Sequence, residues 1–289
     1  MKQTARLLLG LLALSLTPGA FAQTPHEPVN EATTIDLNSV KHLQDFQVVE
    51  FRRYVTANGE RTHFVKFFEA FFPETFEQLG AIVFGQFTER GNPNRFTWLR
   101  GFKDISARPI VSAAFYYGPV WKEHRSKVNA ILPDSDNVSL MRPLRPEQSI
   151  PVLPAVDPVA EQDGAHGVVV AQIFTIKKGS EEVFAKQAQA AFAKYEIAGV
   201  HPAGVLVSLD VPNNFPQLPI RTDGPFLVWL GVVKDDSTLD KQLAPRLTSA
   251  EESLTATGLL RGMPERVVMD PTSRSRLRWL SNEAAKASP

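Results

Sequence analysis

The sequence of 289 residues contains no cysteine. This absence excludes disulfide bonds, thiolate metal sites, cysteine nucleophiles and a lipid anchor attached through cysteine. A domain without these supports depends on the burial of apolar side chains, and a chain of this length can form a core of sufficient size. We therefore expect the fold to be held together by packing.

Positive and negative charges are equal in number. The 31 Lys and Arg residues balance 31 Asp and Glu residues, and the sequence has no block of basic residues. Binding to nucleic acid or to an anionic membrane depends on such a basic surface. We therefore expect neither nucleic acid nor a membrane among the partners.

The N-terminus carries the pattern of a secretory signal peptide over residues 1–22. Lys2 and Arg6 precede the apolar run Leu7 to Leu16, and Ala20-Phe21-Ala22 fits a cleavage site. The alternative is a membrane anchor, but the run is too short for a hydrocarbon core of about 30 Å. We expect cleavage after Ala22 and a mature protein in the periplasm or outside the cell.

Proline is concentrated in one internal stretch, residues 146–165. Pro146, Pro151, Pro154 and Pro158 recur there without periodicity, which is typical of an extended linker. The linker separates two predicted domains, residues 46–145 and 166–272. A polar arm over residues 23–45 precedes them, and a C-terminal tail over residues 273–289 follows.

Both predicted domains have the same order of elements. Strands are predicted at 46–55, 81–89, 95–103 and 138–141 in the first domain, and at 168–176, 204–211, 225–233 and 266–269 in the second. Helices are predicted at 60–79, 106–117 and 119–132, and at 180–197 and 240–257. This is the β-α-β-β-α-β order of a ferredoxin-like unit, present twice.

The two predicted domains also share residues at the same spacing. Trp98-Leu99 and Lys103-Asp104 correspond to Trp229-Leu230 and Lys234-Asp235, which indicates a duplication. One ferredoxin-like unit leaves a sheet face bare, and an apolar face of that size has to be covered. We therefore predict an α+β fold in which two ferredoxin-like repeats form an intramolecular dimeric-type α+β barrel. This is an internal pseudo-dimer, and the sequence leaves the oligomeric state open.

Several motifs occur together in the first predicted domain. They are the E-x-R-x-Y core of Glu50 to Tyr54, residues 73–85, the single residues Asn94, Trp98 and Phe102, and the segments Ser106-Ala107-Arg108 and Pro119-Val120-Trp121. In these motifs the domain resembles the NIPSNAP family, within the dimeric α+β barrel group. The second domain shares the pattern of elements without the polar strand. The resemblance implies the fold, here as a tandem repeat of the domain, and little chemistry, because the biochemistry of the family is poorly defined.

The first strand carries the candidate ligand-binding residues Glu50, Arg52 and Tyr54. Alternation places them on one face, and Val49, Phe51 and Val55 on the other. We expect the apolar set to meet the helices and the polar set to face the barrel interior, as the polar anchor of a small-molecule site. The alternative is a structural Glu–Arg pair with a tyrosine hydroxyl.

Trp98 and Arg100 share a face of another strand and complete the candidate ligand-binding residues; the alternative for Trp98 is core packing. At the positions of Glu50, Arg52 and Tyr54 the second domain has Val170, Gln172 and Phe174. The predicted site therefore belongs to the first domain.

Motifs that would identify a reaction are missing. No two histidines stand at a spacing such as H-x-x-x-H, and no G-x-S-x-G motif occurs. We expect no metal and no cofactor, the catalytic residues are unknown, and Glu69, Glu74 and Glu77 are expected to be solvated.

Three functions fit these observations. The first is the binding of a small, partly apolar ligand. The second is a cofactor-independent oxygenase or isomerase, by analogy of fold alone. The third is a protein-interaction module, which a filled barrel interior would favour.

Overall fold

The computed structural model describes residues 46–280. The predicted signal peptide, the predicted arm and residues 281–289 of the predicted tail lie outside this range. The first unit contains β1 (Val48–Val55), α1 (Arg61–Phe71), α2 (Pro73–Gln78), β2 (Ala81–Glu89), β3 (Arg95–Phe102), α3 (Ala107–Tyr116), α4 (Pro119–Ile131) and β4 (Val138–Pro143). After the short 3₁₀ helix η2 (Pro146–Gln148), the second unit contains β5 (Val168–Thr175), α5 (Glu181–Phe192), η3 (Ala193–Tyr195), β6 (Val200–Ser208), β7 (Phe226–Val233), α6 (Asp236–Thr238), η4 (Leu239–Leu243), α7 (Ala244–Ala256) and β8 (Glu265–Pro271).

The eight strands form one closed barrel with the order β1-β3-β2-β8-β5-β7-β6-β4. Each unit contributes four neighbouring strands, ordered β4-β1-β3-β2 and β8-β5-β7-β6. The antiparallel pairs β2–β8 and β4–β6 join the units. The predicted fold, two ferredoxin-like units that close an α+β barrel within one chain, is confirmed.

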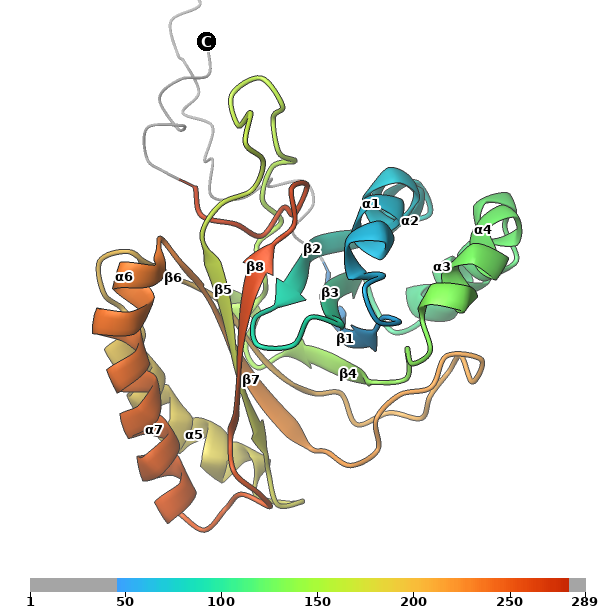
Figure 1. The fold of residues 1–289 in the computed structure, drawn as a ribbon. Coiled ribbons are helices and arrows are strands. Elements are labelled where there is room, and N and C mark those ends of the chain that lie inside the picture. Colours follow the sequence, from blue (N-terminus) through green and yellow to red (C-terminus); the bar gives the residue numbers. More distant parts are fainter. Residues whose placement is uncertain (1–45, 281–289) are drawn as a thin grey trace, which may run out of the picture. The chain divides into compact units, whose positions relative to one another are not determined.

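Helices cover the outside of the barrel, with α1 to α4 over the first unit and α5 and α7 over the second (Figure 1). The helix predicted over residues 60–79 is interrupted, since α1 ends at Phe71 and α2 begins at Pro73. Proline has no N–H to continue a helical ladder, and it is favoured at the first position of a new helix.

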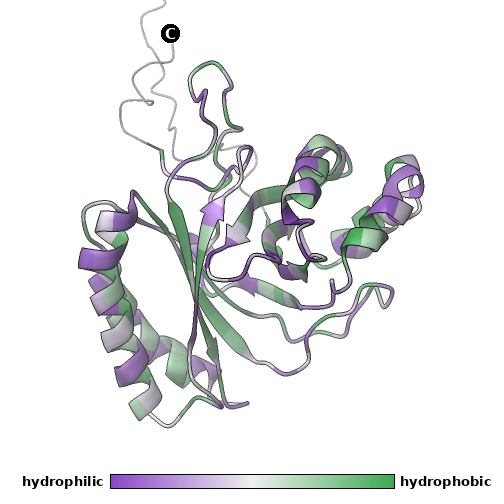
Figure 2. Ribbon diagram, in the orientation of Figure 1, coloured by the Kyte–Doolittle hydropathy of each residue, from purple (hydrophilic) through white to green (hydrophobic). Residues whose placement is uncertain are grey.

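The barrel interior is filled by apolar side chains from all eight strands. They include Val49 and Phe51 of β1, Leu99 of β3, and Val169 and Ala171 of β5. Ile150, Val152 and Leu153 from the predicted linker and Leu277 near the end of the described chain join the same cluster. Hydrophobic colouring accordingly follows the strands in Figure 2.

This arrangement corrects the predicted faces of β1. Val49 and Phe51 point into the barrel, whereas Tyr54 packs in the cluster that contains α1 to α4. Glu50, Arg52 and Tyr54 therefore face the helices, opposite to the prediction. Both faces of β1 are buried. The alternation of side chains along the strand therefore separates two sets of residues but does not show which set faces the barrel interior.

Residues 272–280 return to the first unit and bond to α1 and α2. The Glu69 carboxylate accepts hydrogen bonds from Thr272 Oγ1 at 2.7 Å and Ser273 Oγ at 2.9 Å. Glu74 pairs with Arg274, and Glu77 pairs with Arg276. The expectation of a solvated Glu69 was wrong, because this carboxylate is buried against a segment that is distant in the sequence.

Candidate functional site

Glu50 lies at the centre of a buried ion cluster. Its Oε2 accepts hydrogen bonds from Arg52 Nη1 at 2.7 Å and from Arg100 Nη2 at 2.5 Å. Its Oε1 accepts one from Arg108 Nε at 2.7 Å. All four residues are at most 1% exposed. We call these four residues the Glu50 cluster.

All five predicted site residues come together around this cluster. The antiparallel register of β1 and β3 places Glu50 opposite Arg100 and Arg52 opposite Trp98. Tyr54 accepts a hydrogen bond from Arg52 Nε at 2.7 Å. The Arg52 guanidinium lies 5.3 Å from the centre of the Trp98 ring, within the range of a cation–π contact.

Arg108 of α3, named above only as part of the motif Ser106-Ala107-Arg108, was not predicted as a site residue, and neither were its partners from the second unit. Arg108 Nη1 donates to Asn213 Oδ1 at 3.0 Å and Asn214 Oδ1 at 2.9 Å, in the loop between β6 and β7. A signal for Arg108 is present, because it shares helical spacing with the buried Val111 and Phe115. The two asparagines carry no such local signal.

The Glu50 cluster has an excess of positive charge. Three guanidiniums face one carboxylate, which leaves a net charge of 3 − 1 = +2 in a buried site. Within residues 46–280, Arg100 Nη1, Arg108 Nη2 and the adjacent Trp98 Nε1 are buried without a hydrogen-bond partner. Buried donors without partners are rare and costly, so these three groups call for an explanation.

The cluster determines the ionisation of its members. Burial alone would raise the pKa of Glu50, but the charges of Arg100, Arg52 and Arg108 hold that pKa far below its usual range. Burial raises the pKa of Tyr54 to about 12, despite the opposing charge of Arg52. At neutral pH the carboxylate is therefore ionised and the phenol is neutral.

The lowered pKa of Glu50 leads to a pH-dependent stability. A carboxylate whose pKa is lower in the folded state stabilises the fold above its unfolded pKa of about 4.3, and this contribution is lost as the pH falls. Between about pH 5 and pH 3, wild-type stability should decline faster than that of Glu50→Gln, by up to about 1.4 kcal/mol per pH unit. Urea denaturation of both proteins over this range measures the difference. Parallel curves would contradict the assigned charge state.

A cavity of about 430 Å³ lies beside the cluster, between the sheet and the helices of the first unit. Arg52, Tyr54 and Trp98 form its polar wall. Seven aromatic side chains from α1 to α4 and the turn between α3 and α4 also line it: Phe68, Phe72, Phe76, Phe115, Tyr116, Tyr117 and Trp121. The β6–β7 loop of the second unit contributes Phe215, Gln217, Leu218 and Pro219. The cavity thus combines an apolar body with a buried polar end, as small-molecule sites do, and exposed polar residues such as Lys122, Arg125 and Asp136 line its solvent side.

The second unit has no counterpart of this charged site. Gln172 lies opposite Trp229, as Arg52 lies opposite Trp98, and Val170 lies opposite Gly231, as Glu50 lies opposite Arg100. The Trp229 ring fills the space where a Cβ of Gly231 would stand. Gln172 is satisfied by Tyr195 and by α7. The fold can therefore be built without the Glu50 cluster.

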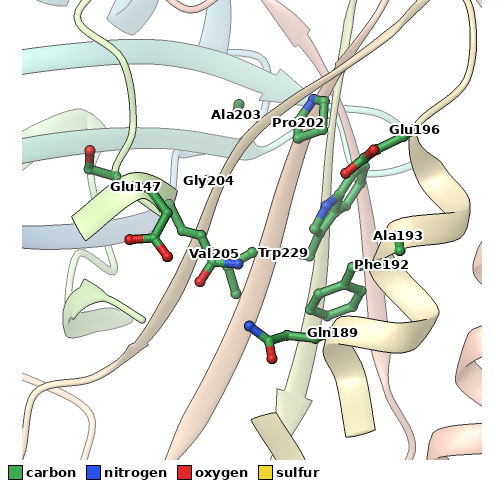
Figure 3. A pocket seen from close by; sticks show the side chains of 12 residues that line it. Glu147, Gln189, Phe192, Ala193, Glu196, Pro202, Ala203, Gly204, Val205 and Trp229 are labelled. Atoms are coloured by element: carbon green, nitrogen blue, oxygen red, sulfur yellow. The ribbon is translucent and has the colours of Figure 1, made fainter. Parts of the chain in front are cut away.

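A separate cavity of about 360 Å³ lies in the second unit, between β6 and α5 (Figure 3). Trp229 and Phe192 line it, together with Gln189, Glu147 and Glu196. Both carboxylates are exposed to solvent. Because exposed groups keep their hydration, this cavity lacks the buried charge that distinguishes the first one.

No group of three or more His, Asp or Glu side chains that could hold a metal ion is found in residues 46–280. In the same part of the chain, every helix is too short or too polar to cross a bilayer.

No family model matches the sequence, and no curated protein matches it. Several solved structures, however, are similar to this chain. An anthrone oxidase-like protein is 11% identical, with 83% of this chain and 98% of that chain covered and a TM-score of 0.48. A NIPSNAP family protein of unknown function from Agrobacterium tumefaciens is 20% identical, with 35% of this chain and 91% of that chain covered and a TM-score of 0.32. A mutant chlorite dismutase from Candidatus Nitrospira defluvii is 10% identical, with 80% and 94% covered and a TM-score of 0.46. The chain is thus similar to a NIPSNAP protein and to dimeric α+β barrel proteins, and the barrel itself is established by the closed strand order of this chain.

Proposed function

We propose that this protein binds a small, partly apolar ligand in the cavity beside the Glu50 cluster. The observation that carries the proposal is an aromatic cavity of about 430 Å³ with Arg52, Tyr54 and Trp98 at one end. Cavities of this size and composition are typical of small-molecule sites. The proposal includes export of the protein, which the signal-peptide pattern of residues 1–22 supports.

The position of the cavity changes how the three candidate functions compare. A filled interior was the feature that favoured a protein-interaction module, and the interior is filled. The cavity, however, lies on the other face of β1, next to the predicted site residues. Ligand binding therefore remains the leading proposal, with its site moved from the barrel interior to the layer between sheet and helices.

A neutral fluorescent probe, N-phenyl-1-naphthylamine, tests the proposal. We expect saturable binding to the wild type, with enhanced probe emission as the probe leaves water. Leu132→Trp should weaken this binding, because Leu132 lines the cavity and a larger side chain takes up part of its volume. Ile110→Trp is the matched control, since Ile110 lies on the neighbouring helix α3 and is 71% exposed.

Fluorescence titration and thermal melting of the three proteins measure both binding and folding. Ile110→Trp should bind the probe as the wild type does. Absence of saturable binding to the wild type, or equal binding to Leu132→Trp, would refute the proposed cavity.

A further inference from the structure

We infer that the ligand is an aromatic oxyanion, and that its anionic group lies against Arg52 and Trp98 at the polar end of the cavity. This inference rests on the proposed function, because it assigns a chemical class to the ligand of the same cavity. It follows from the net charge of the Glu50 cluster, from hydrogen-bond donors without a partner at the polar end of the cavity, and from the aromatic walls of the cavity.

The charge of the Glu50 cluster is the first argument. One buried carboxylate cannot neutralise three buried guanidiniums, and an uncompensated buried charge is strongly destabilising. The second unit has Val170, Gln172 and Gly231 at the positions of Glu50, Arg52 and Arg100, so the architecture does not require these charges. An anion at the open side of the cluster would compensate the excess.

Donors at the polar end are the second argument. Trp98 is 2% exposed, lines the cavity and has an unpartnered Nε1, which can only donate a hydrogen bond. Arg52 lines the cavity beside it, and its Nε and Nη1 are already bonded to Tyr54 and Glu50. Its Nη2 has no hydrogen bond to any other described residue. A guanidinium N–H beside an indole N–H suits an acceptor-only group such as a carboxylate, sulfonate or phosphate.

The remaining charged residues of the lining also favour an anion. Lys122 and Arg125 of α4 contribute two positive charges to the wall, and Asp136 contributes the one carboxylate. Both basic residues and Asp136 are exposed, so all three lie toward solvent, where their net charge is 2 − 1 = +1. An approaching anion therefore meets positive charge before it reaches Arg52.

The walls are the third argument. Phe76 and Phe115 are stacked with ring centres 4.1 Å apart, and Trp121 lies 5.9 Å from Phe115. Flat aromatic rings pack against such walls edge to face or with an offset. The body of the ligand is therefore expected to be aromatic or similarly flat.

Competition against N-phenyl-1-naphthylamine tests the inference with two matched compounds, 1-naphthoate and 1-naphthol. The rings are the same, and only the naphthoate is charged at neutral pH. We expect the naphthoate to bind about 10–100-fold more tightly, because hydrogen bonds to charged groups are worth one to two tenfold steps in affinity. Arg52→Gln should reduce this preference to about threefold or less, because it weakens the binding of naphthoate much more than that of naphthol.

Arg90→Gln is the control, since it removes one positive charge from a surface pair with Asp236 and Asp270. It should keep the preference of the wild type. Naphthalene-1-sulfonate and 1-naphthyl phosphate, measured in the same way, show which oxyanion fits best.

The outcomes separate the two proposals. The inference that the ligand is an anion is refuted if naphthoate and naphthol bind equally, or if Arg52→Gln keeps the preference of the wild type. In either case, binding of the probe still supports the cavity as a ligand site. Failure of every probe to bind the wild type overturns the proposed function itself. If inorganic sulfate competes with the probe as strongly as naphthoate does, the inference that the ligand is aromatic is refuted. If Arg52→Gln does not fold, the comparison of naphthoate with naphthol on the wild type decides the question.

Discussion

Replacing Glu50 with alanine is expected to lower the free energy of unfolding by about 3–5 kcal/mol, the usual cost of removing one partner from a buried ion pair. Glu50 is fully buried and is the shared acceptor of Arg52, Arg100 and Arg108. Without it, three buried guanidiniums repel one another in a site that water hardly reaches. Urea denaturation at neutral pH measures the loss.

Two variants serve as references for this experiment. Asp223→Ala removes a carboxylate that is also paired with an arginine but is 61% exposed, so the loss should stay below about 1 kcal/mol. Arg52→Gln should cost less than Glu50→Ala, because Arg100 and Arg108 still neutralise the carboxylate. A loss for Glu50→Ala no larger than that for Asp223→Ala would show that Glu50 is not the counter-ion of the cluster.

Replacing Leu277 with alanine is expected to destabilise the protein by about 2–5 kcal/mol, the range for truncating a buried leucine. Leu277 is 1% exposed and packs in the apolar cluster of the barrel interior. Its N–H donates to the Phe84 carbonyl at 2.8 Å, and its Cβ lies close to Gly85. The segment after β8 thus contributes to the core, although it follows the last strand of the barrel.

Met263→Ala is the control for this effect. Met263 is 79% exposed, and its truncation should change stability by about 0.5 kcal/mol at most. Thermal or urea unfolding of both variants provides the comparison. Equal stability of Leu277→Ala and Met263→Ala would mean that residues 272–280 do not pack as described.

The order of strands and helices could be predicted from the sequence because each element carries its own period of apolar residues. The strand predicted over residues 95–103 is β3, and the helix predicted over residues 119–132 is α4. Closure of the barrel followed from one physical requirement, the covering of two bare sheet faces. These inferences use local patterns, which a single sequence contains.

The orientation of the β1 side chains could not be predicted in this way. Val49 lies in the barrel and Val48 lies against the helices, and both are buried. When both faces of a strand are covered, polarity no longer distinguishes them. The aromatic rings that surround Glu50 and Arg52 come from helices whose packing direction only the tertiary structure reveals.

The residues that the second unit contributes to the site also could not be predicted from the sequence. Arg108 bonds to Asn213 and Asn214, and Phe215 stacks on Tyr116 with ring centres 6.3 Å apart. These residues belong to a loop of the other unit, and no periodic pattern marks them. The juxtaposition exists because β4 pairs with β6 and carries this loop toward α3.

A crystal structure with bound 4-iodobenzoate would show whether an aromatic oxyanion lies between the sheet and the helices of the first unit. Anomalous scattering locates the iodine, and the density shows the orientation of the carboxylate. We expect the iodine among Phe72, Phe115 and Trp121 and a carboxylate oxygen within hydrogen-bond distance of Arg52. An iodine inside the barrel or in the cavity beside Trp229, or a carboxylate turned away from Arg52, would contradict this expectation.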